Sequence, residues 1–457
     1  MLITAMLGTM LAPLNSTMIV VALPEMLHEF GRSFAWGTWI VISYLVAMAA
    51  VQPLGGSLGD RYGRRRIFLA GLSLFLVATV VAALAWRIEV LIVARIVQAI
   101  GGASAIPNGT ALVRSLVPPA RQGRAFGKIG AGIAVAAALG PPVGGVLTDT
   151  LGWRWIFAAN ILLISPALVL GLRLPADRIL SGTGRFDLRG AALLTSGLVT
   201  LAFSLTAWRL SGVPLAVAPL LLAFAIGAGV FLSRHVQRHP RPVLNLTLFR
   251  RPGYLPATLT VLLSNMTMYT VLLSLPVFLT GRNNWSSSSV GFLLAGMSFQ
   301  MILFSPVGGW LSDRSGRRLP AVIGTSLIAA GTLPLLVIRP DWSWPFYLVP
   351  LVLLGIGVGL SAASVQTAAI EVAPSDQTGQ AAGLFSTMRY LGSITGSAGM
   401  AAILSSVTPS IGSFRLLYAL LLLAACGALV SAGRLPRRLT SGDAVEAGSV
   451  PLPIKQA

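Results

Sequence analysis

Long apolar runs separated by short charged gaps dominate this chain. The runs are about 20 residues long, which is the length an α-helix needs to cross the hydrocarbon core of a bilayer. The pattern therefore predicts an all-α polytopic membrane protein with fourteen transmembrane helices. The predicted segments lie roughly at 1–24, 36–59, 67–86, 89–112, 124–148, 154–172, 188–209, 213–233, 254–280, 289–312, 319–338, 344–370, 378–404 and 413–433.

The basic residues are distributed unevenly between the two sets of gaps. If Met1 is cytoplasmic, the loops on that side hold 24 of the 33 Lys and Arg residues and the opposite loops hold seven, with Arg95 and Arg389 inside helices. Cytoplasmic loops of membrane proteins carry an excess of Lys and Arg. The distribution predicts a multi-pass protein of the inner (cytoplasmic) membrane with both termini in the cytoplasm.

One charged dodecamer occurs twice. Residues 55–66 read GGSLGDRYGRRR, and residues 308–319 read GGWLSDRSGRRL in the same register, 253 residues further on. Such self-similarity indicates an internal duplication, and because both copies end on the same membrane face, the halves are parallel repeats. The predicted domains are a six-helix bundle (1–172), a linker with two additional helices (173–250), a second six-helix bundle (251–437) and a disordered cytoplasmic tail (438–457).

The composition also indicates a membrane protein, and it limits the kinds of partner that we expect. Hydrophobic residues make up 55% of the chain and charged residues 10%, and the formal net charge is +20. The basic residues lie in the gaps between spanning segments, so we expect contact with membrane lipids and no binding of nucleic acid.

Several kinds of chemistry find no support in the sequence. One cysteine, Cys426, and three histidines cannot form a Cys/His metal site, so no metal and no cofactor are expected. With only two lysines, Lys128 and Lys455, there is no GxxxxGK[ST] phosphate loop. A membrane-embedded enzyme would need clustered His or Asp inside helices, so we expect no enzyme.

Three further motifs lie inside the predicted helices. Small residues recur at every fourth position from Gly132 to Gly144, which gives a flat face for close helix packing, and GPPVGG at 140–145 adds two prolines. Arg95, in RIVQAIGG, lies about 9 Å inside its helix at 1.5 Å per residue. An intramembrane arginine is costly and suggests a functional site, although Arg95 could instead snorkel to the surface. The third motif is LNSTMIVVALP, at 14–24.

With these motifs, the chain resembles the major facilitator superfamily over nearly its whole length, in its fourteen-helix drug:proton antiporter branch. The resemblance implies a charge latch between the halves that is closed when the cavity faces outward. Asp60 would reach the helix start near Thr378, and Asp313 the helix start near Arg124. A topology signal alone is the simpler alternative for the arginines. The implied latch residues are Gly56, Asp60, Arg61, Gly63, Arg64, Asp313, Arg314, Gly316 and Arg317.

The resemblance also assigns residues to an antiporter motif and to a central cavity, and it shows departures from the family pattern. Ala99 replaces a glycine, and Asn15 and Val20 replace the aspartate and asparagine that members of the branch typically carry. The antiporter motif, associated with exporters, comprises Gly140, Pro141, Gly144 and Gly145. The cavity and substrate residues are Asn15, Arg95, Gln98, Tyr269, Gln366 and Arg389.

The resemblance implies a secondary transporter that exports small, drug-like organic molecules by alternating access, with protons as the coupling ion. No carboxylate lies in the middle of any predicted helix, whereas Arg95 and Arg389 lie inside helices. The cavity should therefore have a positive potential and should prefer neutral, zwitterionic or anionic molecules. We expect a monomer. An exporter of one specific metabolite or antibiotic, and a non-transporting sensor or scaffold, remain as alternatives.

Overall fold

The computed structural model is all-helical, without strands, in the residues that it describes. These are residues 2–32, 34–116, 119–174, 187–207, 214, 216–239, 246–373, 378–404 and 409–436. Some side chains within the helices, including those of Asp60, Arg124 and Thr378, lie outside the description, as does the predicted tail. The elements are α1 (Leu2–Phe30), α2 (Phe34–Tyr62), α3 (Arg64–Ala83), α4 (Ile88–Leu116), α5 (Pro119–Leu151), α6 (Arg154–Leu172), α7 (Leu188–Ala207), α8 (Val217–Arg238), η1 (Leu246–Arg250), α9 (Tyr254–Asn283), α10 (Ser287–Ser315), α11 (Arg318–Thr332), η2 (Leu333–Val337), α12 (Trp344–Glu371), α13 (Thr378–Ile403) and α14 (Ile411–Gly433).

Each predicted segment overlaps one α-helix. Ten of the described helices are long and apolar enough to cross a membrane, which identifies a multi-pass integral membrane protein; that all fourteen cross it stays a prediction. The segment predicted at 319–338 divides into α11 and the 3-10 helix η2. Pro334 lies at this junction, and proline has no N–H to continue the α-helical hydrogen bonding.

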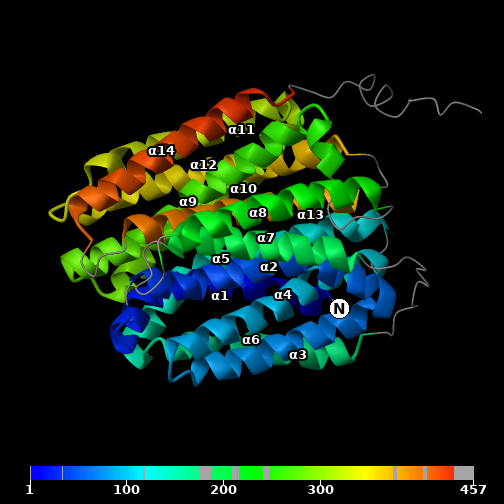
Figure 1. Cartoon of the computed structure of the whole chain (residues 1–457), viewed down its shortest axis with the longest axis horizontal. Helices are drawn as coiled ribbons and strands as arrows, with labels where there is room; N and C mark the ends of the chain where they lie inside the picture. The colour runs from blue at the N-terminus through cyan, green and yellow to red at the C-terminus, as the bar shows by residue number, and fades with distance from the viewer. Residues whose placement is uncertain are drawn as a thin grey trace, which may run out of the picture.

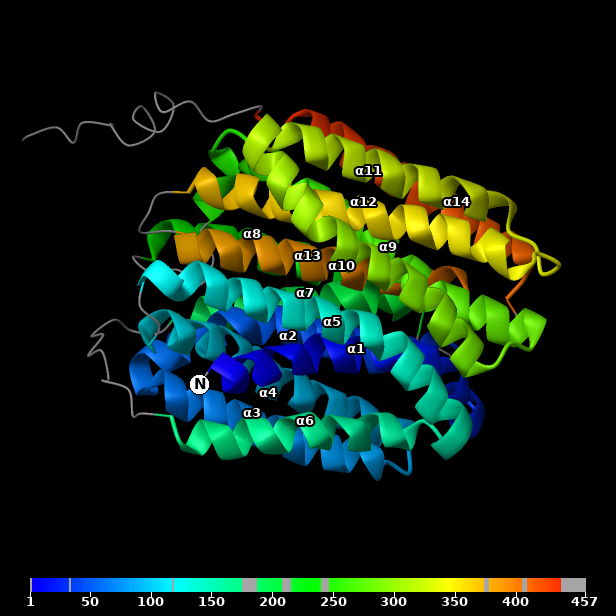
Figure 2. The ribbon, with the colours of Figure 1, turned by 180° about the vertical axis from the view of Figure 1, so that it is seen from behind.

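The helices run side by side (Figure 1), and they differ in how much of their surface is buried. In α1, α9 and α12, 61% of the most apolar window is buried, against 17% in α8. The α7–α8 pair covers the face turned toward the viewer in Figure 1, where α7 contacts α2 and α13. On the opposite face, seen in Figure 2, α5 contacts α10. The polar side chain of Asn15 on α1 is fully buried and therefore lies inside the protein.

The repeated dodecamers form matching helical hairpins at one end of the bundle, which we call the hairpin end. Gly63 separates α2 from α3 with φ 99°, and Gly316 follows α10 with φ 85°. These positive φ values are unfavourable for residues with a Cβ atom. The duplicated glycine is therefore required by the turn itself.

The first glycine of each dodecamer also has the same packing role in both copies. A Cβ atom on Gly55 would lie 2.6 Å from the carbonyl oxygen of Ala103 on α4, and one on Gly308 would lie 2.4 Å from that of Leu360 on α12. In each copy, glycine allows two helix backbones to approach closely. The α2–α4 and α10–α12 contacts correspond, as expected for two related halves.

Candidate functional site

A buried arginine on α4 joins three helices at the centre of the structure. Arg95 is 1% exposed and donates from Nη1 to Asn15 Oδ1 on α1 (2.9 Å) and to Gln98 Oε1 one turn along α4. Its Nε donates to the carbonyl oxygen of Ile40 on α2 (3.4 Å), and its guanidinium lies 3.9 Å from the centre of the Tyr44 ring. The sequence analysis assigned Asn15, Arg95 and Gln98 to one cavity, and in the structure Arg95 is hydrogen-bonded to both of the other two.

The partners of Arg95 stabilise a charge that they do not neutralise. Each hydrogen bond to a charged group contributes roughly 1.5–3 kcal/mol, and a desolvated cation–π contact with Tyr44 adds about 2 kcal/mol. Among the described residues, no carboxylate forms an ion pair with Arg95. The centre of the protein therefore holds a fixed positive charge within a polar but neutral shell.

Two polar atoms on residues that contact Arg95 have no hydrogen-bond partner in the described part of the chain. They are Asn15 Nδ2 and Tyr44 OH, and both are buried. A buried polar group without a partner costs about 1–3 kcal/mol. Their gathering on α1 and α2 beside Arg95 is what a site for a polar ligand requires.

The second half of the chain contributes tyrosines to the same region. Tyr269 on α9 is 8% exposed and lies within electrostatic range of the Arg95 guanidinium and of Tyr390 on α13. Arg389 is half-buried and lies 5.4 Å from the ring of Tyr390. Gln366 on α12 is exposed. Of the predicted cavity residues, Asn15, Arg95, Gln98 and Tyr269 are therefore brought together, whereas Gln366 is not among the buried polar groups.

The first hairpin contacts neighbouring helices of the N-terminal part of the chain. Arg64 donates to the carbonyl oxygen of Ala111 at the end of α4 (3.4 Å). Arg61 is exposed and lies 5.4 Å from the Tyr62 ring, and Gly56 faces Pro107 of α4. The predicted contact from Asp60 to Thr378 falls on side chains outside the described residues.

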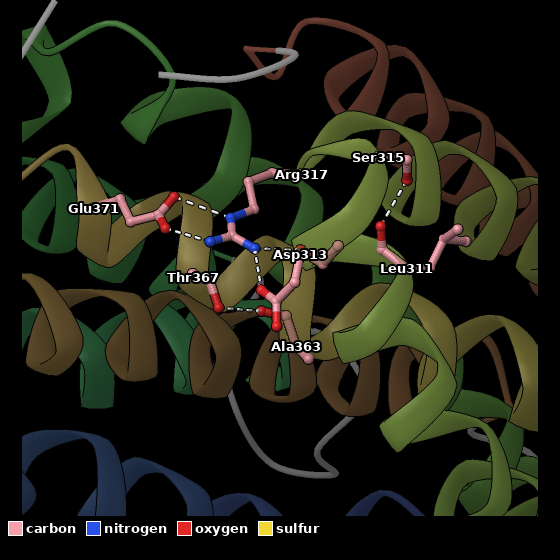
Figure 3. Close-up of polar contacts among 8 residues, drawn as sticks. Leu311, Asp313, Ser315, Arg317, Ala363, Thr367 and Glu371 are labelled. Atoms are coloured by element: carbon pink, nitrogen blue, oxygen red, sulfur yellow. Dashed lines mark hydrogen bonds and ion pairs between the residues drawn. The ribbon is translucent and has the colours of Figure 1, made fainter. Parts of the chain in front are cut away.

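The second hairpin forms an ion-pair network with α12 (Figure 3). Arg317 Nη1 donates to Asp313 Oδ1 (2.9 Å), and Arg317 Nε donates to Glu371 Oε2 (3.0 Å). The Glu371 hydrogen bond is the main cause, with Asp313, of a raised pKa of Arg317. Arg314 lies over the Trp310 ring at 5.4 Å. Asp313 is 80% exposed, so its contact with α5 stays a prediction for another conformation.

The glycines of the antiporter motif lie against two different helices. A Cβ on Gly140 would lie 1.8 Å from Thr17 Oγ1, and one on Gly144 would lie 2.9 Å from the Met18 backbone, both on α1. A Cβ on Gly145 would lie 2.4 Å from the Ser287 carbonyl oxygen at the start of α10. The motif thus packs α5 against its own half and against the other half.

The same α5–α10 contact continues on both sides of Gly145. A Cβ on Gly291 of α10 would lie 2.3 Å from the carbonyl oxygen of Pro141. Asp149, beyond the predicted span 124–148, accepts from the backbone N–H groups of Ser287 (3.0 Å) and Ser288 (2.7 Å). A carboxylate at a helix N-terminus interacts favourably with the free N–H groups and the helix dipole.

Hydrogen bonding at this helix start also sets the charge of Asp149. Partial burial acts to raise the pKa of the Asp149 carboxyl, but the hydrogen bonds from Ser288 and Ser287 outweigh it, so the net pKa is lowered. Asp149 is therefore charged at neutral pH. From this end, α5 and α10 diverge toward the hairpin end (Figure 2).

Sequence reasoning missed three partners. Thr79 on α3 accepts from Gln98 Nε2 (2.8 Å), and Glu371 and Tyr390 were not assigned a role. Nothing in the sequence distinguishes Thr79 as a partner of Gln98, because hydroxyl residues are common in apolar helices. Glu371 could have been found as an acid at the end of a predicted helix that packs beside the second hairpin.

Known proteins resemble this chain in sequence. The sequence profile of the Major Facilitator Superfamily matches residues 5–397 and 257–453. The uncharacterized MFS-type transporter YvkA of Bacillus subtilis is 34% identical over 399 residues, covering 87% of this chain and 89% of YvkA. The multidrug resistance protein Stp of Mycobacterium tuberculosis is 31% identical, covering 89% of this chain and 75% of Stp.

Solved structures show the same fold. A peptide transporter POT covers 96% of both chains with a TM-score of 0.72 and 17% identity. A D-xylose-proton symporter covers 95% of this chain and 97% of its own, with a TM-score of 0.67 and 16% identity. The fold, the profile and the relatives lead to one conclusion: this chain is a transporter of the Major Facilitator Superfamily.

Proposed function

We propose that the protein exports small, drug-like organic molecules across the cytoplasmic membrane by alternating access. Two six-helix halves, 1–172 and 251–437, would rock about the region around Arg95, with α7 and α8 as additional spans. The support is the family, the relatives named as multidrug resistance proteins, and the glycine contacts of α5.

The distribution of basic residues gives this proposal a direction across the membrane. With both termini cytoplasmic, the hairpin end faces the cytoplasm, and the contact of Asp149 with the start of α10 faces outside. Because α5 and α10 meet at this outer end and diverge toward the inner end (Figure 2), this conformation would be inward-facing. The predicted latch, which joins each hairpin to a helix start of the other half, would form in the opposite conformation.

The observation that carries the substrate proposal is the charge of Arg95. It is buried, and it is bound by the neutral side chains of Asn15 and Gln98. A cation entering this site would be repelled without a compensating carboxylate, whereas an anionic or neutral molecule could accept hydrogen bonds from the unpaired donors around it. The site therefore favours neutral, zwitterionic and anionic substrates over quaternary ammonium dyes.

Under the same proposal, proton coupling would differ from that of typical members of the branch, because Asn15 replaces their aspartate. Asn15 cannot titrate, so coupling would run through an acid at a helix end, which is Asp60, Glu25 or Asp149. Because Asp149 holds the start of α10, protonating it would weaken the contact at the outer end.

Uptake into everted membrane vesicles tests the substrate proposal. Vesicles with the wild-type protein should accumulate neutral and anionic antibiotics and should not accumulate ethidium-type cations. Arg95→Gln should reduce the preference for anions, whereas Arg415→Gln, at an exposed arginine near the start of α14, serves as the matched control. Equal pumping of cationic dyes and neutral antibiotics by the wild type would contradict the proposal.

A further inference from the structure

Three side chains that can bind metal meet where α7 begins and α8 ends. Asp187, His235 and His239 each offer a ligand atom, and these atoms lie within 4.8 Å of one another. Asp187 is 4% exposed, and both histidines are half-buried. The expectation of no metal site considered only Cys/His sets and left out a mixed carboxylate–histidine set, whose Asp lies 48 residues before the first His.

The local structure holds all three side chains in place. Asp187 precedes the first turn of α7 and accepts from the backbone N–H of Gly190 through Oδ1 (2.8 Å), which fixes its carboxylate as an N-cap. The His239 N–H donates to the His235 carbonyl oxygen (3.0 Å), so the last turn of α8 continues to His239. Histidines four residues apart share one helix face, and their ring centres lie 5.3 Å apart.

The geometry lies within reach of a tetrahedral site. His235 Nε2 and Asp187 Oδ1 form a hydrogen bond of 2.6 Å, which a bound ion would replace. A metal–nitrogen bond of about 2.0–2.1 Å places tetrahedral ligand atoms roughly 3.4 Å apart. The three ligand atoms now lie within 4.8 Å of one another. Small side-chain rotations of the two histidines at the end of α8 would bring these atoms to the tetrahedral spacing. Asp187 can bind an ion while keeping its hydrogen bond from Gly190, because a carboxylate has about four acceptor positions.

The ligand types select the class of ion. Imidazole nitrogens favour zinc, copper, nickel and iron over calcium and magnesium, and one carboxylate with two histidines is a common zinc-binding set. The hydrogen bond from Gly190 orients the Asp187 carboxylate, as outer-shell contacts do in known metal sites.

We propose that Asp187, His235 and His239 bind a divalent transition-metal ion of the zinc class. The ion joins the start of α7 to the end of α8. Since α7 also contacts α2 and α13, metal binding restrains a helix pair that lies along two helices from different halves of the chain. The inference does not depend on which molecule the protein transports.

Cobalt titration of the purified full-length protein tests the site. The protein is prepared in detergent with an affinity tag free of histidine, stripped with chelator, and titrated with Co²⁺ at pH 7.5. The wild type should bind one equivalent with visible absorption bands of a four-coordinate ion, and Zn²⁺ should displace it. Because the ligands bind in deprotonated form, binding should weaken as the pH is lowered.

Matched variants separate this site from adventitious binding. His235→Ala and His239→Ala should each weaken Co²⁺ binding by more than about tenfold. Asp187→Asn tests the carboxylate while leaving an N-cap residue in place, since asparagine caps helices as well as aspartate does. The remaining histidine of the chain, His28, lies on α1, and His28→Ala should bind Co²⁺ as the wild type does. Absent Co²⁺ bands in the wild type, or full binding by the His235→Ala/His239→Ala double variant, would overturn the proposal.

Discussion

The contact of Gly145 with α10 predicts how to shift the protein away from its present conformation. In Gly145→Ala, the added Cβ would lie 2.4 Å from the Ser287 carbonyl oxygen and 2.8 Å from the Ser287 carbonyl carbon. Both atoms are backbone, so no side chain can rotate away. Because ordinary contact needs about 3.4 Å, the two helices must separate by roughly 0.6–1 Å.

This separation has an estimable cost. Overpacking a close interface costs about 1–3 kcal/mol, and a change of that size shifts a two-state equilibrium about 5- to 150-fold. The cost arises only while α5 and α10 are in contact, so the conformation with this end open becomes more populated. The closed end is the one that we propose faces outside.

Cysteine accessibility measures the shift. Ser288→Cys is introduced in a Cys426→Ser background, and its modification rate with a membrane-impermeant maleimide is recorded in intact cells. Gly145→Ala should raise the rate at least about fivefold. Gly229→Ala is the control, because a Cβ there meets no atom within 4 Å. A folded Gly145→Ala protein whose rate matches that of the control would refute the reasoning.

Three further predictions follow from described residues. Gly316→Ala should lower the thermal unfolding midpoint, because φ 85° and ψ 171° cost about 1–3 kcal/mol for alanine, whereas Gly309→Ala, in an open helical position, should not. Asn15→Asp should create or strengthen substrate-dependent proton release in proteoliposomes by placing a carboxylate beside Arg95; unchanged release would contradict this. Asp149→Asn should weaken the α5–α10 contact by about 0.3–1 kcal/mol, which would be measured as faster labelling of Ser288→Cys. The pKa of the Asp149 carboxyl is lowered, so its contact with α10 is complete above the usual pKa of aspartate and is lost only as the pH falls below that value. With Asp149 in place, the labelling rate should therefore be constant from about pH 5 to 8.

The sequence allowed prediction of features that depend on local patterns. The hairpin glycines, Gly63 and Gly316, stood out because the same turn occurs in both halves. The helices were found from their apolar runs, but their ends were not. For example, α5 begins at Pro119, before the predicted 124, because hydropathy detects the apolar part of a helix and not its polar extension.

Contacts between distant segments could not be predicted in the same way. Arg95 was predicted to lie inside the membrane, but its 2.9 Å contact with Asn15, 80 positions away in the chain, was not predicted. Asp149 was noted only as an acid at a helix end, because its partners Ser287 and Ser288 begin a helix in the other half. Which helix ends meet is decided by packing and by conformational state, and neither leaves a periodic pattern.

The guanidinium of Arg95 has an electrical consequence. A full elementary charge crossing the membrane potential exchanges about 2.3 kcal/mol per 100 mV, and Arg95 carries such a charge inside the bundle without a counter-ion among the described residues. Any motion that moves water-filled space from one side of Arg95 to the other changes the fraction of the field that this charge experiences. The resting voltage of the cell would then bias the protein's conformational equilibrium even when the transported molecule is uncharged.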